Sequence, residues 1–383
     1  MTLGSFVVRN AFRNKRRSVL TVASITFSLL LLTLMMSIWR SFYIDPVAPE
    51  SANRIITRNR VSLSFFLPGY YREKIRSIPG VVAVAPETWF GLHYKDDRPE
   101  NAFPQVATDP DEYLNVVLDK IVPPDQVAAW QHDRAGALVD VALAKKFGWK
   151  IGDKITLMGT IFPLNPELTI RAMYRRDPPQ NTLYFNQKYL EEGVGWFKGQ
   201  AGFYATRVAN PDDVARVSAA IDDTFRNSPQ PTKTESEKAF QLSFIATLGN
   251  VKAFILAICG AVVFAILLVS ANTMAMSVRS RTREVAVLKT LGFTRGSVLS
   301  LFVGEAVALA VLGGVFGILL AAGTMRLMTL VSGTIGLPAS LKLTVPTAAV
   351  ALLVAAFVGF VSGCIPAYDA ARTNIVEGLR HIG

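Results

Sequence analysis

A long uncharged segment constrains the fold of this chain more than any other feature. It runs from Ala253 to Val278, and none of its 26 residues carries a charge. A helix needs about 20 predominantly apolar residues to cross the hydrocarbon core of a bilayer. We therefore expect this segment to form a transmembrane helix.

Three further segments have the same character. Residues 18–39 and 346–366 carry no charge, and residues 297–323 carry only Glu305. With 51% hydrophobic residues, the chain is too apolar for one ordinary soluble domain. The sequence therefore predicts four transmembrane helices, over residues 18–40, 251–278, 297–323 and 346–366.

The net charge of +11 is distributed unevenly along the chain. Residues 41–250 hold 24 Lys/Arg and 25 Asp/Glu, whereas the first 17 residues hold five basic residues and no acid. The excess lies in short segments beside the apolar ones, as the positive-inside rule predicts for cytoplasmic segments. We expect both termini and residues 279–296 in the cytoplasm, and residues 41–250 outside. This placement argues against nucleic acid as a partner.

The first 17 residues are predicted to form a cytoplasmic amphipathic lead-in, with apolar side chains toward the lipid. A basic start before an apolar run also occurs in signal peptides. Here the uncharged run has 22 residues, and Trp39-Arg40 follows it in place of a small-residue cleavage site. We expect an uncleaved first span. Residues 324–345 are predicted as a short outer loop, and residues 367–383 as a cytoplasmic tail.

Residues 41–250 have mixed helix and strand patterns and are long enough for a core of their own. The predicted fold is therefore a membrane protein with four transmembrane α-helices and a large α+β extracytoplasmic domain between the first two. Strands are predicted at 81–85, 154–158, 168–174 and 203–208, and helices at 70–78, at 140–147 and after Asn210. Residues 100–165 show no regular helix or strand pattern and are predicted to form a second subdomain.

The end of this domain matches a helix start signal. Thr234-Glu235-Ser236-Glu237 fits the capping box, in which the first hydroxyl and the last carboxylate cap each other's backbone. A helix beginning at Thr234 either continues into the second span or breaks near Gly249. The sequence leaves both arrangements open.

A basic stretch, Arg279 to Gly292, lies between the second and third predicted spans. Val285, Leu288 and Leu291 recur every three residues, which predicts a helix with a narrow apolar stripe. Gly292 follows where a left-handed residue would end that helix. One interpretation is a basic loop that sets orientation, and the other is a coupling helix that receives force from a partner. The candidate coupling residues are Arg281, Arg283, Glu284, Val285, Leu288, Lys289, Leu291 and Gly292.

Several residues within the spans also stand out. Glu305 is ionisable, and we assign it a structural role near the inner end of its span, with a substrate or proton role as the alternative. Gly313-x-x-x-Gly317 and Gly359-x-x-x-Gly363 are spacings that let helices approach closely. These four glycines are expected to pack within the bundle or across a dimer.

Motifs of common catalytic sites are missing from the sequence. It contains no G-x-x-x-x-G-K-[ST] phosphate loop, no G-x-S-x-G and no H-E-x-x-H. The two cysteines and three histidines are not at metal-ligand spacing. We therefore expect no catalytic, cofactor or metal site in this chain.

The segment Arg283-Glu284-Val285-Ala286-Val287-Leu288-Lys289-Thr290-Leu291-Gly292 resembles the R-E-[IV]-A-[IVL]-x-[KR]-x-[LM]-G signature of MacB/FtsX-type ABC transporter permeases. Glu305 falls where that family often has a glutamate. The ending resembles the family's tail, although Asn374 replaces a usual proline. The matching residues are Pro366-Ala367, Ala370-Ala371-Arg372 and Ile375-Val376-Glu377-Gly378-Leu379-Arg380, and the candidate tail residues among them are Arg372, Glu377, Leu379 and Arg380.

The resemblance implies a non-catalytic permease subunit of a bacterial inner membrane, with a MacB-like core domain outside. It implies a second copy or a paralogue as dimer partner, and a cytoplasmic ABC ATPase subunit that binds ATP and Mg. Closure of the ATPase would press on the coupling helix and move the outer domain, exporting or extracting a hydrophobic, peptide or lipid-like substrate. A periplasmic adaptor is a further candidate partner. The alternative is an FtsX-like regulator that activates an extracytoplasmic partner without transport.

Overall fold

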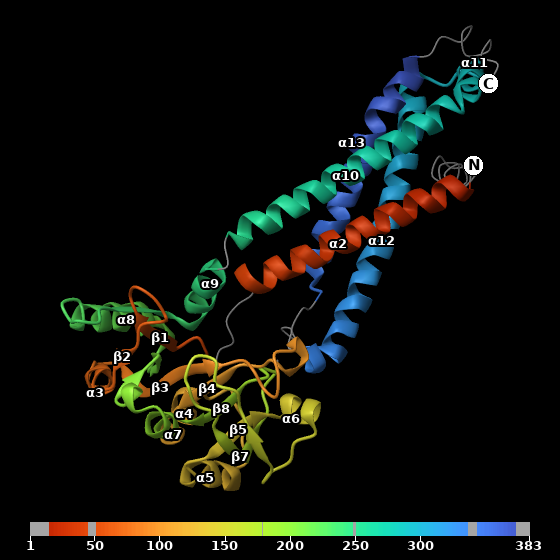
Figure 1. Ribbon diagram of the computed structural model, residues 1–383. Helices are drawn as coiled ribbons and strands as arrows, with labels where there is room; N and C mark the ends of the chain where they lie inside the picture. Colours follow the sequence, from red (N-terminus) through yellow and green to blue (C-terminus); the bar gives the residue numbers. More distant parts are fainter. Residues whose placement is uncertain (1–14, 45–50, 178, 248–249, 336–342, 373–383) are drawn as a thin grey trace. The chain divides into compact units, whose positions relative to one another are not determined.

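The computed structural model describes residues 15–44, 51–177, 179–247, 250–335 and 343–372 (Figure 1). The chain divides into two compact units. One is a helical bundle formed by the N-terminal segment and most of the chain after Asn250. The other is an α+β domain formed mainly by residues 46–249.

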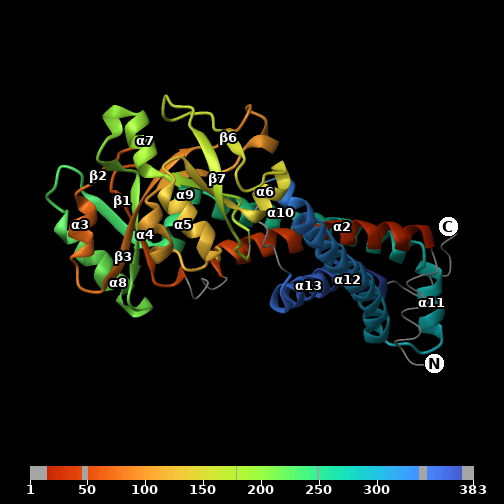
Figure 2. The same ribbon diagram turned by 90° about the horizontal axis from the view of Figure 1, so that it is seen from below.

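Four helices among the described residues are long and apolar enough to cross a membrane. This confirms the predicted set of four apolar helices with an α+β domain between the first and second. A fifth, shorter helix lies between the second and third, at one end of the bundle (Figures 1 and 2). The helices of the bundle are α2 (Lys15–Tyr43), α10 (Val251–Arg279), α11 (Thr282–Thr290), α12 (Arg295–Ile335) and α13 (Val345–Arg372).

Some helix ends differ from the predicted boundaries. α12 continues beyond Gly323 to Ile335, because no proline or strong breaker follows the apolar segment. α13 continues through Pro366 to Arg372. Proline removes one backbone hydrogen bond, which helices packed in a bundle tolerate, and Pro366 is buried here. Residues 1–14 lie outside the described part of the chain, so the amphipathic lead-in stays a prediction.

The first glycine pair lies where α12 crosses α2. A Cβ atom on Gly313 would lie 2.6 Å from Cγ2 of Ile25, and one on Gly317 would lie 2.8 Å from the carbonyl oxygen of Thr26. The hydroxyl of Thr26 also donates a hydrogen bond to the carbonyl oxygen of Gly313 at 3.2 Å. Only glycine permits this approach, so both residues serve packing within one chain.

The second glycine pair lies where α13 crosses α12. A Cβ on Gly359 would lie 2.7 Å from the Cβ of Ala310, and one on Gly363 would lie 2.9 Å from the Cβ of Ala306. α12 is thus held against α2 on one side and α13 on the other by small residues. Membrane helices lack a hydrophobic driving force toward each other, so this close packing is a main source of their association.

The α+β domain is built on a nine-stranded sheet in the order β11-β1-β10-β3-β4-β8-β5-β7-β6. The pairs β4–β8 and β5–β7 are parallel, and the other pairs are antiparallel. The strands are β1 (Arg54–Asn59), β3 (Val81–Gly91), β4 (Gln105–Thr108), β5 (Gly136–Asp140), β6 (Lys154–Thr156), β7 (Glu167–Tyr174), β8 (Leu183–Asn186), β10 (Phe203–Val208) and β11 (Thr232–Ser236). A separate two-stranded sheet pairs β2 (Leu67–Pro68) with β9 (Gln200–Ala201).

Helices cover both faces of the large sheet. Val84 of β3 packs in a cluster with α3 and α8, whereas its neighbours Ala83 and Ala85 pack with α4 and α5. Within this domain, α3 and α8 lie at one end and α6 at the other (Figures 1 and 2). The helices are α3 (Tyr71–Arg76), α4 (Pro110–Val116), α5 (Pro124–His132), α6 (Val141–Phe147), α7 (Gln187–Gly193), α8 (Val214–Thr224) and α9 (Glu237–Thr247), with short 3-10 turns η2 (Pro99–Asn101), η3 (Gly195–Phe197) and η4 (Pro211–Asp213).

Strand β7 contains an extra residue. Ala137 of β5 pairs with Ile170, but the next residue, Leu138, pairs with Ala172. Arg171 is therefore a bulge, where two residues oppose one. As a result, Ile170 packs on one face of the sheet and Ala172 on the other, although both have even numbers.

The prediction of an irregular second subdomain over residues 100–165 is wrong. This region contains strands β4, β5 and β6 and helices α4, α5 and α6, and its strands belong to the one nine-stranded sheet. Its elements have three to nine residues each. Such short elements give too few turns or alternations for a periodic pattern to emerge.

The predicted helix start at Thr234 is also wrong. Thr234 lies inside β11, which pairs with β1, and α9 begins only at Glu237. The hydroxyl of Ser236 accepts a hydrogen bond from the backbone N–H of Ala239 at 3.3 Å, so the capping role falls two residues later. α10 then begins as a new helix, because the side chain of Asn250 caps it by accepting from the N–H of Ala253.

A buried polar network fixes the loop between α4 and α5. The Nζ of Lys120 donates to the hydroxyl of Tyr113 at 2.8 Å and lies 4.7–5.3 Å from the ring centres of Tyr113, Tyr174 and Tyr184. Three aromatic faces stabilise the ammonium, while burial lowers the pKa of Lys120 to about 7. The adjacent Asp119 pairs with Arg54 of β1, so this loop is joined to the sheet.

We predict that replacing Gly317 with leucine destabilises the bundle by about 1–3 kcal/mol, because the side chain has no room against Thr26 and Leu29. The matched control is Gly323→Leu in the same helix, where a Cβ meets nothing within 4 Å. Thermal unfolding of the full chain in lipid nanodiscs gives the melting temperature of each variant. Equal melting temperatures for the two variants would contradict the assigned packing.

The pKa of Asp119 gives a second prediction. Burial acts to raise it, but the hydrogen bond from Arg54 and the charges of Arg54 and Arg176 outweigh burial and lower it to about 2. The folded-state value lies below the ordinary value of 3.8, so the stabilisation is complete above about pH 4 and is lost as the pH falls toward 2. The size of the shift corresponds to roughly 2 kcal/mol.

Asp119→Asn is therefore expected to lower the free energy of unfolding of the α+β domain at neutral pH. Urea unfolding of the full chain, followed at several pH values, measures the difference from the wild type. That difference should be constant above about pH 4 and shrink between about pH 4 and pH 2. A difference independent of pH down to 2 would show that the carboxylate charge does not contribute.

Candidate functional site

Helix α11 is held between two long helices by a short reversal of the chain. α10 ends at Arg279, and the backbone N–H of Ser280 bonds back to the carbonyls of Met276 and Val278. α11 follows from Thr282 to Thr290, and Gly292 then adopts φ +92°. That left-handed conformation suits glycine, as the sequence predicted. The stretch is therefore a distinct helix of nine residues.

One face of α11 packs into the bundle. Val285 and Ala286 are each 1% exposed. Val285 belongs to a cluster with residues of all three neighbouring long helices. These are Met274 of α10, Val298, Phe302 and Ala306 of α12, and Ala367 and Ala370 of α13. Any displacement of α11 therefore acts on three long helices together.

A buried ion pair strengthens this attachment. Nη1 of Arg281 lies 2.9 Å from Oε2 of Glu305 in α12, and the two side chains are 7% and 1% exposed. The other carboxylate oxygen, Oε1, has no hydrogen-bond partner in the described part of the chain. Glu305 thus depends on Arg281 for its charge balance there, which favours the structural role assigned to it.

A third contact joins α11 to the end of α13. Nζ of Lys289 donates to the carbonyl oxygen of Ala371 at 2.6 Å. Helix C-termini leave such carbonyls without intrahelical partners, and a lysine is a favourable donor to them. The next residue, Arg372, lies 4.5 Å from the ring centre of Tyr368. Glu377, Leu379 and Arg380 lie outside the described residues.

Exposed side chains lie on the side of α11 away from Val285 and in the turn that follows the helix. Val287 of α11 is 44% exposed, and Leu291 and Phe293 of the turn are 71% and 46% exposed. Arg283 of α11 and Arg295, the first residue of α12, are exposed as well. Exposed apolar side chains grouped within a basic surface are typical of a site that another protein covers. We call these five residues the α11 outer face.

The predicted stripe of Val285, Leu288 and Leu291 is divided between the two faces. Val285 is buried, Leu288 is half-buried and Leu291 is exposed. Glu284 and Lys289 are half-buried, and Lys289 lies on the same side of the helix as Val285, four residues before it. Sequence reasoning missed Val287, although Arg283 and Val287 are four residues apart and so share one side of a helix.

The described residues contain no group of three or more His, Cys, Asp or Glu side chains that could hold a metal ion. The arrangement has an exposed side, and a buried side that contacts three long helices.

Each of the two units matches a known protein family. Residues 18–224 match the MacB-like periplasmic core domain family, and residues 253–375 match the FtsX-like permease C-terminal family. Together with the four apolar helices, these matches indicate a multi-pass membrane protein with an extracytoplasmic domain.

Individual relatives match over shorter stretches. The uncharacterized ABC transporter permease YknZ of Bacillus subtilis is 36% identical over 36% of this chain and 34% of its own length. The macrolide export ATP-binding/permease protein MacB of Rhodopirellula baltica is 41% identical over 29% of this chain and 15% of its own. The uncharacterized ABC transporter permease MJ1507 of Methanocaldococcus jannaschii is 24% identical over 60% of this chain and 58% of its own. The chain therefore spans about a third or less of the first two relatives.

Among solved structures, the periplasmic region of MacB from Actinobacillus actinomycetemcomitans aligns with 51% of this chain and 93% of its own length. The TM-score is 0.38 and the sequence identity is 9%. This likeness is too distant to add to the family matches.

The ion pair leads to a prediction about stability. Arg281→Met leaves the buried Glu305 without a counter-charge, and breaking a buried pair in this way costs about 3–5 kcal/mol. The double variant Arg281→Met/Glu305→Met removes both charges and should unfold at a higher temperature than the single variant. Arg279→Met, at an exposed neighbouring arginine, is the control and should resemble the wild type. A double variant less stable than the single one would contradict this account.

Proposed function

Because this chain belongs to the family of MacB/FtsX-type ABC transporter permeases, we propose that it couples ATP hydrolysis by a separate ATPase subunit to movement of its extracytoplasmic domain. In this proposal the permease itself catalyses no reaction. The ATPase presses on α11, and the long helices pass the displacement across the membrane.

The observation that supports the proposal best is that α11 is exposed on one side and packed against the long helices on the other. Its outer face exposes Val287, Leu291 and Phe293, which together offer an apolar contact to a soluble protein. Its inner face is fixed by Val285 and by the Arg281–Glu305 pair. A force on the outer face would therefore move α10, α12 and α13, because well-packed interiors have low compressibility and transmit strain.

The proposal assigns nucleotide binding to the partner. The 383 residues contain no phosphate-binding loop, in which backbone N–H groups and a lysine hold the phosphates of ATP. ATP and Mg would accordingly bind the ATPase subunit. The relative MacB is described as an ATP-binding/permease protein, which supports a functional link between the two activities.

We further propose that the substrate is hydrophobic, peptide-like or lipid-like and is exported or extracted. The support comes from relatives, which are described as macrolide and pyoverdine export proteins. Arg279, Arg283 and Arg295 beside the apolar helices favour a cytoplasmic position for α11 in the bacterial inner membrane, with both termini on the same side. A second copy or a paralogue would complete a dimer.

We predict that Leu291→Glu weakens binding of the ATPase by at least roughly tenfold, since a buried interface residue of this size contributes about 1–3 kcal/mol. The matched control is Val61→Glu in the α+β domain, at a side chain that is 74% exposed and outside the bundle. Copurification from membranes and ATP hydrolysis by the complex measure the effect.

Four results distinguish the alternatives. Loss of binding for Leu291→Glu alone supports the proposal, and equal binding of both variants overturns the role of the α11 outer face. If the wild type binds and stimulates no ATPase at all, the family function does not apply to this chain. Stimulated hydrolysis without any transported small molecule would favour the regulator alternative.

A further inference from the structure

The chain enters and leaves the α+β domain through two neighbouring strands. β1 is the first strand after α2, and β11 is the last strand before α9 and α10. These two strands pair antiparallel, from Ile55 opposite Ser236 to Asn59 opposite Thr232. Among the described strands β11 lies at the edge of the sheet, and its backbone ladder pairs with β1 alone.

An edge strand of five residues is a weak connection on its own. It offers few backbone hydrogen bonds, and short edge elements are among the first parts of a sheet to open. A pull on β11 from the following helices would then separate it from β1 before it moved the sheet. Movement of the domain therefore requires side-chain contacts that hold β11 in place.

Two ion pairs connect β1 to β11 and to the start of α9. Nε of Arg54 lies 2.6 Å from Oε2 of Glu237, the first residue of α9. Nε of Arg58 lies 3.1 Å from Oε1 of Glu235 in β11. The arginine side chains are only 4% and 12% exposed, so water screens these pairs less than it screens surface pairs. We call these four residues the strand clamp.

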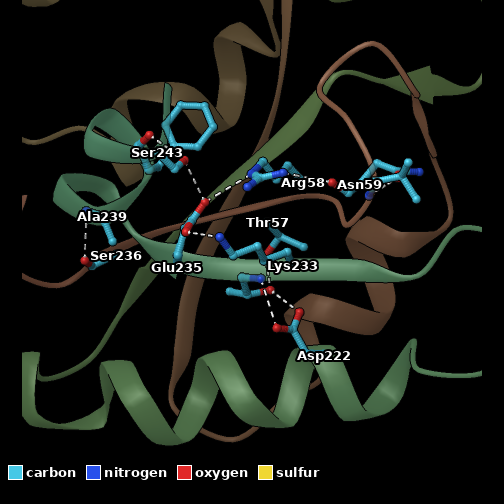
Figure 3. A network of polar contacts seen from close by, with 12 residues as sticks. Thr57, Arg58, Asn59, Asp222, Lys233, Glu235, Ser236, Ala239 and Ser243 are labelled. Carbon is cyan, nitrogen blue, oxygen red and sulfur yellow. Dashed lines mark hydrogen bonds and ion pairs between the residues drawn. The ribbon is translucent and has the colours of Figure 1, made fainter. Parts of the chain in front are cut away.

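Glu235 makes further contacts beside its ion pair with Arg58. Figure 3 shows its carboxylate near Arg58, Lys233 and Ser243. The ammonium of Lys233 lies 2.8 Å from Oε2, and the hydroxyl of Ser243 in α9 donates to Oε1 at 3.2 Å. One carboxylate in β11 thus connects β1 with α9.

A second carboxylate holds β11 from the other side of the strand (Figure 3). Asp222 of α8 accepts hydrogen bonds from the hydroxyls of Thr232 and Thr234, each at 2.8 Å, and from the N–H of Thr234 at 3.0 Å. The hydroxyl of Thr234 lies 3.1 Å from that of Thr57 in β1. β11 is therefore fixed to a helix as well as to its neighbouring strand.

Arg54 extends the clamp into the rest of the domain. Its Nη1 lies 2.5 Å from Oδ1 of Asp119, and Asp119 also pairs with Arg176, which follows β7. The start of α9 is thus linked through Arg54 and Asp119 to the far half of the sheet. A displacement of α9 reaches β7 without passing through every intervening strand.

We propose that Arg54 and Arg58 are positioning residues that join the entry and exit strands into one rigid unit, so that motion of the membrane helices moves the whole α+β domain. This inference rests on the proposed function, because it concerns how the domain is moved. Neutralising the clamp should uncouple domain movement from ATP hydrolysis while the ATPase still binds α11.

The test uses the full chain with its ATPase in nanodiscs, with Cys259 and Cys364 replaced by Ala and a fluorophore on Trp196→Cys, an exposed position of the α+β domain. Two quantities are measured, the rate of ATP hydrolysis and the ATP-dependent change in fluorescence. The variants are Arg54→Gln/Arg58→Gln and the charge-conserving Arg54→Lys/Arg58→Lys.

A matched control lies at the opposite edge of the same sheet. Lys154 of the edge strand β6 pairs with Glu167 of β7 at 2.9 Å, but both side chains are exposed. Lys154→Gln removes a cross-strand pair in the same way without touching the connections to the membrane helices. It should leave both measured quantities unchanged, since exposed pairs contribute little.

We expect Arg54→Gln/Arg58→Gln to reduce the fluorescence change at least roughly fivefold while hydrolysis stays within about twofold of the wild type. The lysine variant should recover part of the change. If the double glutamine variant does not fold, Arg58→Gln alone serves, because Arg54 then keeps its pairs with Glu237 and Asp119.

The outcomes separate the two proposals. A wild-type response that persists in the glutamine variants overturns the strand clamp and leaves the proposed function intact. A wild type that hydrolyses no ATP with its partner and shows no fluorescence change overturns the proposed function, and the clamp with it.

Discussion

The attachment of α11 to the long helices depends on a charge pair kept away from water. Arg281 and Glu305 would each be costly to bury alone, and together they fix the turn between α10 and α11 to α12. The same turn carries Val285 into the cluster between the helices. These contacts bury one side of α11, and the other side is exposed. Every step of the proposed coupling begins at this arrangement.

The two units of the chain use different physics for cohesion. In the bundle, glycines at positions 313, 317, 359 and 363 bring helices close enough for dense van der Waals contact. In the α+β domain, apolar side chains on both faces of the sheet are covered by helices, and buried ion pairs tie the peripheral strand to the centre. The first kind of contact suits a lipid surrounding, and the second suits water.

Much of this architecture was predictable from the sequence. The uncharged segments predict the four long helices, since backbone groups in lipid must bond within a helix. The glycine spacings predict close packing, and Gly292 predicts the end of α11. The ion pair was not predictable, because 24 residues separate Arg281 from Glu305 and only the packing of α12 brings them together.

Other features escaped prediction because tertiary contacts override local signals. Thr234 fits a helix cap, but β1 offers it a strand partner and Asp222 accepts its backbone N–H. The local and non-local hydrogen bonds compete for the same groups, and the non-local ones win. Val287 was missed because the three-residue spacing of Val285, Leu288 and Leu291 passes over it, although the helix places Arg283 and Val287 on one side.

The extra residue in β7 has a consequence for how this gene can change. Leu168 and Ile170 belong to one core, and Ala172 and Tyr174 to the other, only because Arg171 shifts the alternation between them. Deleting Arg171 would remove the bulge and leave Ile170 and Ala172 on their present faces, whereas deleting Thr169 would place Leu168 and Ile170 on opposite faces. A change in the length of β7 is therefore tolerable at the bulge and disrupts a core elsewhere in the strand.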